Sequence, residues 1–304
     1  MTDRIICIES PGTRLFVRNR QLVVVSPIDE SEKTAPFDDI GALVLGTSHV
    51  SLTGDVLSVL AEAGGCAVVA GGNGLPVMLA LPTSRHSLHG ERADIQVGAA
   101  LPLKKRLWQR IVKSKVKAQA ALLRKIHGDD SGLDEMATRV ASGDTSNIEA
   151  RAARVYWGRI FAPHVFHRSP EGEPPNHLLN YGYAVLRAMT ARAICSAGLV
   201  PVIGLHHCNR YDAFRLADDL MEPFRPMVDQ AVFGITQDRG MATDLDKTAK
   251  SQLISPLLRR YTLEAESRTL FDVLSLLVAS LVAVMDGKQT DICLPIPHAL
   301  LEGE

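Results

Sequence analysis

The first 80 residues of this chain alternate short apolar runs with polar turns, which is the pattern of β-strands. Polar residues 18–21 predict a hairpin turn. Apolar residues at helical spacing predict one helix at 55–63, which Gly64 and Gly65 end before a strand at 66–70. Four other runs rich in Val, Ile and Leu predict strands at 4–9, 14–17, 22–26 and 42–45.

A glycine cluster follows, at Gly71, Gly72, Asn73 and Gly74. A phosphate-binding loop of this kind would end in Lys followed by Ser or Thr and would open a helix, and the sequence shows neither feature. We therefore predict a hairpin turn that leads into a further strand at 75–81.

Around residues 82–100 the apolar spacing changes from a period of two to the helical period, and the rest of the chain is predominantly helical. This change predicts an α+β fold, with a β-rich N-terminal domain at 1–90 and a larger all-α domain at 91–304. The helical part is expected to contain long helices at 177–197 and 267–285 and a tail at 288–304.

The pattern at residues 214–228 predicts a helix with a break. Asp219 and Glu222, three residues apart, share one face of this helix. Pro223 removes a backbone donor and crowds the carbonyl of Asp219, so the helix is expected to kink or stop close to Glu222. Carboxylates beside such a break can turn toward a ligand. The buried side is defined by apolar residues at helical spacing: Phe214, Ala217, Met221, Phe224 and Val228.

Two adjacent histidines, His206 and His207, occupy a polar turn between a short apolar run at 200–205 and this helix. Together with the two carboxylates they form a candidate site. Ordinary explanations stay open: the carboxylates could pair with Arg215 and Arg225 on the surface, and the histidines could be loop residues with satisfied hydrogen bonds.

Composition adds few constraints on function. The formal net charge is −1 at pH 7, so no global field favours nucleic acid. The five cysteines show no C-x-x-C spacing, which argues against a disulfide framework or a thiolate zinc site and favours a cytoplasmic location. Charged residues among the first 20 positions argue against a signal peptide, and the longest apolar run, 270–285, is too short for a membrane span.

One stretch departs from this neutral balance, because residues 95–128 contain nine Lys or Arg residues and no acid. A solvated helix face is one explanation of such a run. Charge of a single sign at this density also suits a polyanion, which makes the face a candidate nucleic-acid contact. The basic stripe consists of residues at helical spacing: Arg106, Arg110, Lys113, Lys117 and Arg124.

A strong helix start lies at residues 145–149. Ser146 and Glu149 have the spacing of a capping box, in which the Glu side chain bonds the backbone amide of the cap residue. This structural explanation of Glu149 stays open beside a role in a functional site.

Four successive segments resemble the motifs of the Cas1 family, the integrase of CRISPR adaptation: IEARAARVYWGRIF, NHLLNYGYAVLRA, GLVPVIGLHH and DLMEPFRPMVD. They span most of residues 145–229, and two of them are most similar to the branch that accompanies Cas9 effectors. The resemblance implies an N-terminal β-domain followed by an α-helical catalytic domain. It also implies a metal-dependent DNA endonuclease and integrase that inserts captured DNA fragments at a CRISPR repeat by transesterification.

In this resemblance the family's metal-binding glutamate matches Glu149, its histidine matches His207 and its second acid matches Glu222. Asp219 matches a neighbouring acid found in part of the family, and His206 is the alternative histidine. Carboxylates combined with an imidazole suit Mg²⁺ or Mn²⁺. The resemblance further implies a homodimer that acts on double-stranded DNA and joins Cas2 in a larger complex.

Two other functions stay open. A metal-dependent phosphodiesterase acting on small substrates would leave the basic stripe without a role, and strongly salt-dependent duplex binding would argue against it. A non-catalytic scaffold would only dimerise and bind a partner. Biological activity retained after replacement of Glu149 and Glu222 would favour this scaffold.

Overall fold

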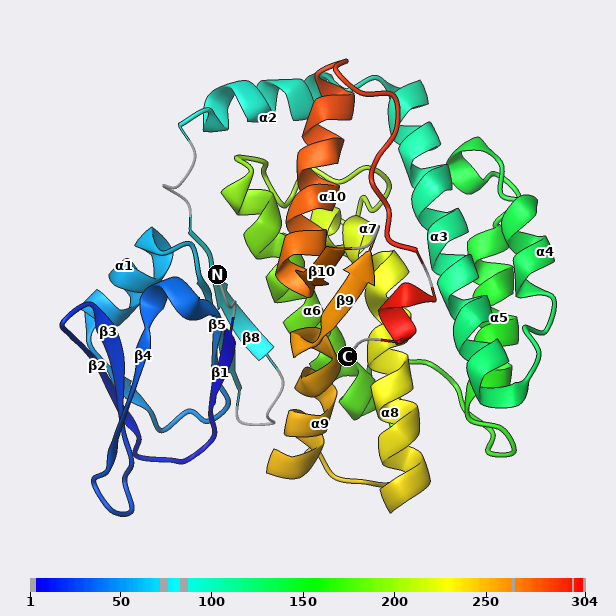
Figure 1. Cartoon of the computed structure of the whole chain (residues 1–304). Coiled ribbons are helices and arrows are strands. Elements are labelled where there is room, and N and C mark those ends of the chain that lie inside the picture. The colour runs from blue at the N-terminus through cyan, green and yellow to red at the C-terminus, as the bar shows by residue number, and fades with distance from the viewer. Residues whose placement is uncertain (1–3, 72–75, 83–86, 264–265, 297, 303–304) are drawn as a thin grey trace.

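The computed structural model describes residues 4–71, 76–82, 87–263, 266–296 and 298–302. The predicted turn residues Gly72, Asn73 and Gly74 lie outside this part of the chain. Strands dominate before Leu81 and helices after His89 (Figure 1), so the predicted mixed fold is confirmed. The division into domains at residue 90 stays a prediction, with which this order of elements agrees.

The described N-terminal residues form two four-stranded sheets. The first has the order β1-β5-β7-β8, in which β1, β5 and β7 are parallel and β8 is antiparallel to β7. The second has the order β4-β3-β2-β6. Helix α1, Gly54–Glu62, packs against β2 and β7. The strands are β1 Arg4–Ile8, β2 Arg14–Arg18, β3 Gln21–Val25, β4 Glu32–Pro36, β5 Ile40–Leu45, β6 Ser51–Leu52, β7 Cys66–Ala70 and β8 Pro76–Ala80.

The predicted hairpin between β2 and β3 is confirmed. Arg18 pairs with Gln21, and the two residues between them have left-handed φ angles, 51° at Asn19 and 57° at Arg20. Such a turn matches the twist of the flanking strands. The apolar pattern misses β4 and β6. Strand β4 lies at a sheet edge and buries only Ala35, and β6 has two residues, so neither shows the alternation by which strands are recognised.

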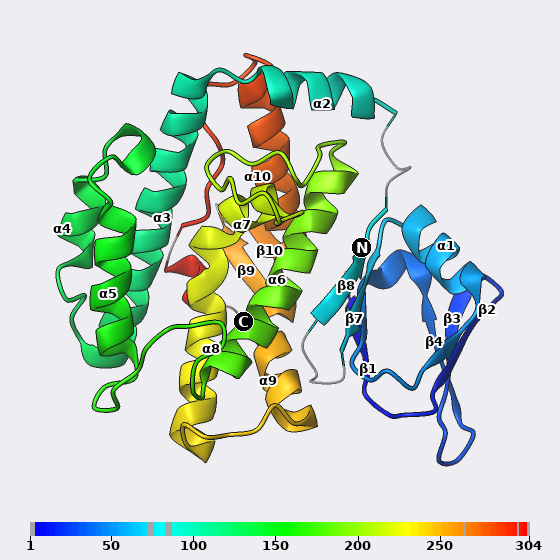
Figure 2. The same ribbon diagram turned by 180° about the vertical axis from the view of Figure 1, so that it is seen from behind.

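A larger set of helices follows the sheets. Helix α6 lies at its centre, packs against α7, α8, α9 and α10, and is buried along most of its length (Figures 1 and 2). Its bounds agree with the predicted 177–197 to within one residue. The helices are α2 His89–Gly98, α3 Leu101–His127, α4 Leu133–Thr138, α5 Ile148–Ile160, α6 Asn176–Ser196, α7 Arg215–Met221, α8 Arg225–Arg239, α9 Lys247–Leu258 and α10 Leu270–Met285.

Strand β5 is buried along its whole length and joins the β-rich region to the helices. Ala42 and Val44 belong to the core formed by the helices, whereas Leu43 and Leu45 belong to the core between the two sheets. Because alternate residues of a strand point to opposite faces, the first sheet has a hydrophobic core on each side. The helical region is therefore joined to the β-rich region through the buried first sheet.

The last long helix begins later than predicted. Residues Glu266–Thr269 form strand β10, which pairs with β9, Arg260–Leu263, so the predicted helix start at Ser267 is wrong by about three residues. The physical reason is a capping box. Thr269 and Asp272 each accept a hydrogen bond from the other's backbone amide, which fixes the first turn at this point.

The described part of the predicted tail at 288–304 is packed against the helices. It runs beside α3 in Figure 1 and buries Ile292, Leu300 and Leu301. Pro297 of this tail lies outside the described residues. None of the helices in the described ranges is both long and apolar enough to cross a membrane.

Candidate active site

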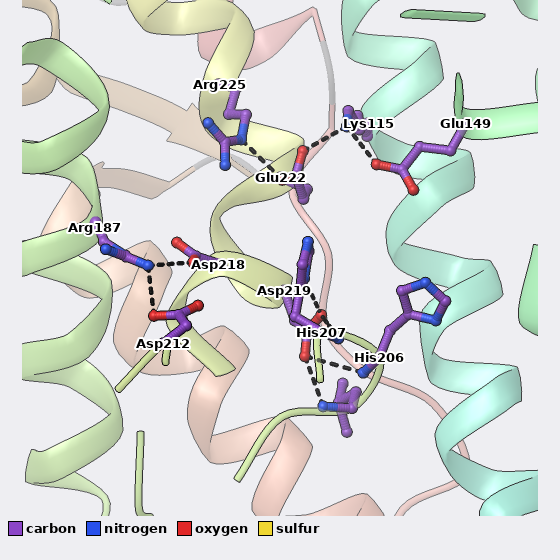
Figure 3. A network of polar contacts seen from close by, with 11 residues as sticks. Lys115, Glu149, Arg187, His206, His207, Asp212, Asp218, Asp219, Glu222 and Arg225 are labelled. Carbon is purple, nitrogen blue, oxygen red and sulfur yellow. Dashed lines mark hydrogen bonds and ion pairs between the residues drawn. The ribbon is translucent and has the colours of Figure 1, made fainter. Parts of the chain in front are cut away.

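Two acids from distant parts of the chain converge on one lysine of α3 (Figure 3). Glu149, in the first turn of α5, places Oε1 2.6 Å from Lys115 Nζ. Glu222, between α7 and α8, places Oε2 2.7 Å from the same nitrogen. Two of the three side chains expected to bind metal are therefore neighbours of one atom.

The break beside Pro223 explains the position of Glu222. As predicted, α7 ends at Met221, a short 3₁₀ turn follows, and α8 begins at Arg225. Glu222 lies at this break with only 3% of its surface exposed, and Arg225 Nε donates a hydrogen bond of 2.9 Å to its Oε1. The ion pair that the sequence allowed does form, but it is buried. The surface explanation of Glu222 is therefore wrong.

Glu222 is negatively charged at neutral pH. Its burial by itself would raise the pKa of its carboxyl. The charges of Arg225 and Lys115, with a contribution from His207, outweigh this effect and lower the pKa of Glu222 to about 2. A buried carboxylate held in its charged form is suited to binding a cation.

Asp219 is fully buried and organises the histidine turn. Its Oδ2 accepts hydrogen bonds from the backbone amides of Leu205 at 2.6 Å and His206 at 3.2 Å. Its Oδ1 accepts from the amide of His207 at 3.1 Å and lies 2.7 Å from Nδ1 of the same residue. A Cβ at Gly204 would lie 2.8 Å from the carbonyl oxygen of His207, so this tight turn requires glycine.

The contact with Asp219 also orients His207. This hydrogen bond raises the pKa of His207 above its ordinary value, against the opposing effect of burial. Because Nδ1 faces the carboxylate, Nε2 is the ring nitrogen left for a ligand. Asp219 is thus a positioning residue for His207. Arg215, the partner that the sequence offered to Asp219, instead donates to the carbonyl of Asn209.

His206 points in a different direction. Its ring stacks on Trp108 of α3, with the centroids 4.2 Å apart and the planes within 3°. His207 meets the same indole edge-on at 5.6 Å. This geometry favours His207 as the ligand. Trp108, which is buried, is a neighbour of the site that the sequence pattern does not single out.

Glu149 does not cap α5. Asp144 takes that role, because its two carboxylate oxygens accept hydrogen bonds of 2.9 Å from the backbone amides of Ile148 and Glu149. Asn147, at the N-cap position, has a left-handed φ of 52°, and no side-chain cap bond is formed by it. The capping-box explanation of Ser146 and Glu149 is therefore wrong, and the Glu149 carboxylate faces Lys115 instead.

Lys115 is the main site residue that sequence reasoning missed. It belongs to the basic run at 95–128, but its position does not follow the basic stripe. It lies on the apolar face of α3, at helical spacing from Leu107, Ile111 and Leu122, which are all buried. A lysine on the buried face of a helix is the signal that could have identified it, because a buried ammonium requires an acidic partner.

Part of the basic stripe is held by contacts with other segments. Arg106 donates to the carbonyl of Thr290, and Arg110 pairs with Asp291 at 2.6 Å, both within the C-terminal segment that runs beside α3. Arg124, at the far end of the stripe, pairs with Asp130 and Asp134. Of the two lysines, Lys117 is exposed and Lys113 is half-buried. A charge count along the sequence therefore overstates the unpaired positive charge of this face.

Two further acids near the site are already paired. Arg187 Nη2 lies 2.8 Å from Asp212 Oδ1 and also contacts Asp218 (Figure 3). Burial raises the pKa of Asp218 to about 6 even with the arginine beside it. Because Arg187 compensates these acids, we assign them no role in the site.

Within the described residues, no group of three or more His, Cys, Asp or Glu side chains is arranged to hold a metal ion. The Lys115 ammonium lies where such an ion would contact Glu149 and Glu222. The donors themselves suit a divalent cation, because two carboxylate oxygens face one cationic atom. Glu222 Oε2 is also buried and, despite its ionic contact with Lys115, has no hydrogen-bond partner.

Solved structures share this fold. A casposase bound to an integration product superposes with a TM-score of 0.76 at 20% identity, covering 95% of this chain and 92% of the casposase. A CAS1 protein from Thermotoga maritima has a TM-score of 0.75 at 18% identity, covering 96% and 100%. A Cas6-RT-Cas1–Cas2 complex has a TM-score of 0.74 at 19% identity, covering 95% and 35%. The fold is thus the one shared by casposases and Cas1 proteins.

Sequence comparisons define the family. The family described as "CRISPR associated protein Cas1" matches residues 6–267. A "CRISPR-associated endonuclease Cas1" from Neisseria meningitidis serogroup C is 32% identical over 95% of this chain and 94% of its own. One from Hyperthermus butylicus is 31% identical over 73% and 74%. The chain belongs to the Cas1 family of CRISPR-associated proteins.

Proposed function

We propose that this protein is a divalent-metal-dependent DNA endonuclease and integrase that inserts captured DNA fragments at a CRISPR repeat by transesterification. The observation that carries the proposal is the convergence of Glu149 and Glu222 on one cationic atom beside the oriented His207. The endonuclease names of the relatives and the casposase bound to its integration product support it. A strand-transfer assay with and without Mn²⁺ tests it.

The side chains of the site fit this chemistry. When bound, a Mg²⁺ or Mn²⁺ ion would neutralise charge on the scissile phosphodiester and favour attack by a 3′-hydroxyl, or by water in hydrolysis. Glu149 and Glu222 would hold it through carboxylate oxygens and His207 through Nε2. Asp219 keeps the imidazole oriented, and Arg225 fixes the carboxylate of Glu222.

We further propose that the basic stripe on α3 contacts double-stranded DNA through Arg106, Arg110, Lys113 and Lys117. Replacing Lys113 and Lys117 together by Gln should weaken duplex binding equally for all sequences. It should also make the negative slope of log affinity against log salt shallower by about 0.9 for each phosphate that the protein no longer neutralises. Binding measured by fluorescence anisotropy at several salt concentrations gives this slope.

A matched control removes the same charge elsewhere. Arg18 of β2 and Arg139 at the end of α4 are exposed, pair with Glu32 and Glu135, and do not belong to the basic stripe. Their double replacement by Gln should leave the salt slope unchanged. If both double variants keep the wild-type slope, the DNA lies on another face.

The partners follow from the reaction. Inserting a fragment requires both 3′ ends to be joined at the two ends of a repeat, so at least two sites must be held at a set distance. We propose that the protein is a homodimer that binds Cas2. The Cas6-RT-Cas1–Cas2 complex among the solved structures supports Cas2 as the partner.

Adding Cas2 should therefore convert single-ended joining into two-ended insertion at the spacing of one repeat, because the larger complex holds the sites apart. Sequencing both junctions of the product measures this. Efficient two-ended insertion by the isolated protein at that spacing would mean that this chain alone sets the distance between the two joining sites.

A further inference from the structure

Lys115 differs from Arg110 and Arg124 of the same helix, whose side chains are about half exposed, because its own side chain is only 12% exposed. Its ammonium contacts Glu149 at 2.6 Å and Glu222 at 2.7 Å, the two acids proposed to hold metal. These acids come from α5 and from the break after α7. The lysine therefore holds together two carboxylates that would otherwise repel each other in a buried setting.

A cavity of about 220 Å³ adjoins this lysine. Arg225 and Arg168 lie over the ring of Tyr183, with the guanidinium carbons 4.5 Å and 5.4 Å from the ring centre. Gln119 Oε1 is buried and has no hydrogen-bond partner. The cavity is lined by Lys115, Gln119, Ala153, Trp157, Arg168, Tyr183, Glu222, Arg225 and Asp229.

The charges around this cavity are formally balanced. Three cations, Lys115, Arg168 and Arg225, face three carboxylates. These carboxylates are Glu149 and Glu222, which contact Lys115, and Asp229, which accepts hydrogen bonds from two tyrosine hydroxyls. A divalent ion bound between Glu149 and Glu222 would add two positive charges and displace the ammonium. An excess of positive charge in a cavity lined by buried polar groups favours an anion.

We propose that Lys115 is an internal cation that occupies the metal position and, when a divalent ion binds, moves into the adjoining cavity and binds a phosphate of the DNA. The long, flexible stem of lysine permits this movement, and its ammonium is a point charge suited to phosphate. Metal and DNA then bind cooperatively, each strengthening the other. This inference rests on the proposed function, because it assumes the metal and the DNA substrate.

The test is Mn²⁺ binding measured by electron paramagnetic resonance, without DNA and without catalysis. Lys115→Met removes the competing cation, so that Glu149 loses its ion pair with Lys115 and Glu222 keeps only Arg225. The affinity of this variant for Mn²⁺ should therefore rise by about tenfold or more. The same variant should lose the gain in duplex affinity that Mn²⁺ gives the wild-type protein, and with it most strand transfer. Lys104→Met, about three turns earlier on α3, should match the wild type in each measurement.

Each result decides between the two claims. Wild-type binding of Mn²⁺ with equal or weaker binding by Lys115→Met would overturn the role of Lys115 and leave the proposed function standing. Failure of both the wild type and Lys115→Met to bind Mn²⁺ would overturn both claims. Lys115→Gln, which keeps a polar side chain without the charge, repeats the measurement if the methionine variant does not fold. It should also bind Mn²⁺ more tightly than the wild type.

Discussion

Replacing Glu149 or Glu222 by Gln should lower strand transfer by about a thousandfold, because each substitution removes a charged oxygen that faces the position of Lys115 Nζ. Gln keeps the size of the side chain, so the cavity is not enlarged. The measurement is the initial rate at which a labelled 3′ end is joined to a supercoiled repeat plasmid in Mn²⁺. His207→Gln should show a smaller loss, of about a hundredfold, because two acidic ligands remain.

Stability must be measured in parallel, since each substitution leaves Lys115 with one partner fewer. A cost of about 1–3 kcal/mol in the free energy of unfolding is expected when a buried partner is removed. Glu135→Gln is the matched control, because Glu135 is exposed and pairs only with Arg139 among the ion pairs of the described chain. It should keep full activity. A folded Glu222→Gln protein with normal activity would remove this acid from the site.

Asp219→Ala should lower the free energy of unfolding by about 3–5 kcal/mol. The carboxylate is fully buried and accepts hydrogen bonds from three consecutive backbone amides, Leu205 to His207, as well as contacting the imidazole. Without it, three backbone donors lose their acceptor at once. Urea unfolding followed by circular dichroism measures the change.

The neighbouring acid provides the comparison for this prediction. Asp218 is one residue away and contacts Arg187, whose side chain is partly exposed. Asp218→Ala should therefore cost less stability than Asp219→Ala. Equal losses in the two variants would mean that the bonds to the histidine turn contribute little, and that His207 is positioned by other contacts.

The fold was predictable where local pattern and burial agree. The strands β1, β2, β3, β5 and β7 have apolar runs long enough to recognise, and Pro223 marks the helix break through its missing amide. Strand β4 was missed because it is a mostly exposed strand at the edge of its sheet and lacks an apolar run. The start of α10 was misplaced because strand and helix share the residues up to Thr269, and only the cap to Asp272 separates them.

The candidate site was likewise predictable only as far as local sequence patterns reach. Family motifs named Glu149, His207 and Glu222, but no local pattern could show that α5 and the break after α7 meet across α3. Lys115 was hidden among nine basic residues, although its place on the apolar face distinguishes it. Asp219 has the appearance of a ligand in sequence, yet it faces the backbone of the histidine turn. These roles depend on tertiary contacts.

The most direct test of the proposed integrase is the joining of DNA ends by the wild-type protein. A short duplex with labelled, free 3′-hydroxyls is incubated with a supercoiled repeat plasmid, with and without Cas2, in Mn²⁺ or in a chelator. Covalent joining is expected in Mn²⁺, with none in the chelator and none when the duplex ends in 3′-deoxynucleotides. Joining that persists in the chelator, or no joining in Mn²⁺ with Cas2 present, would contradict the proposed integrase function.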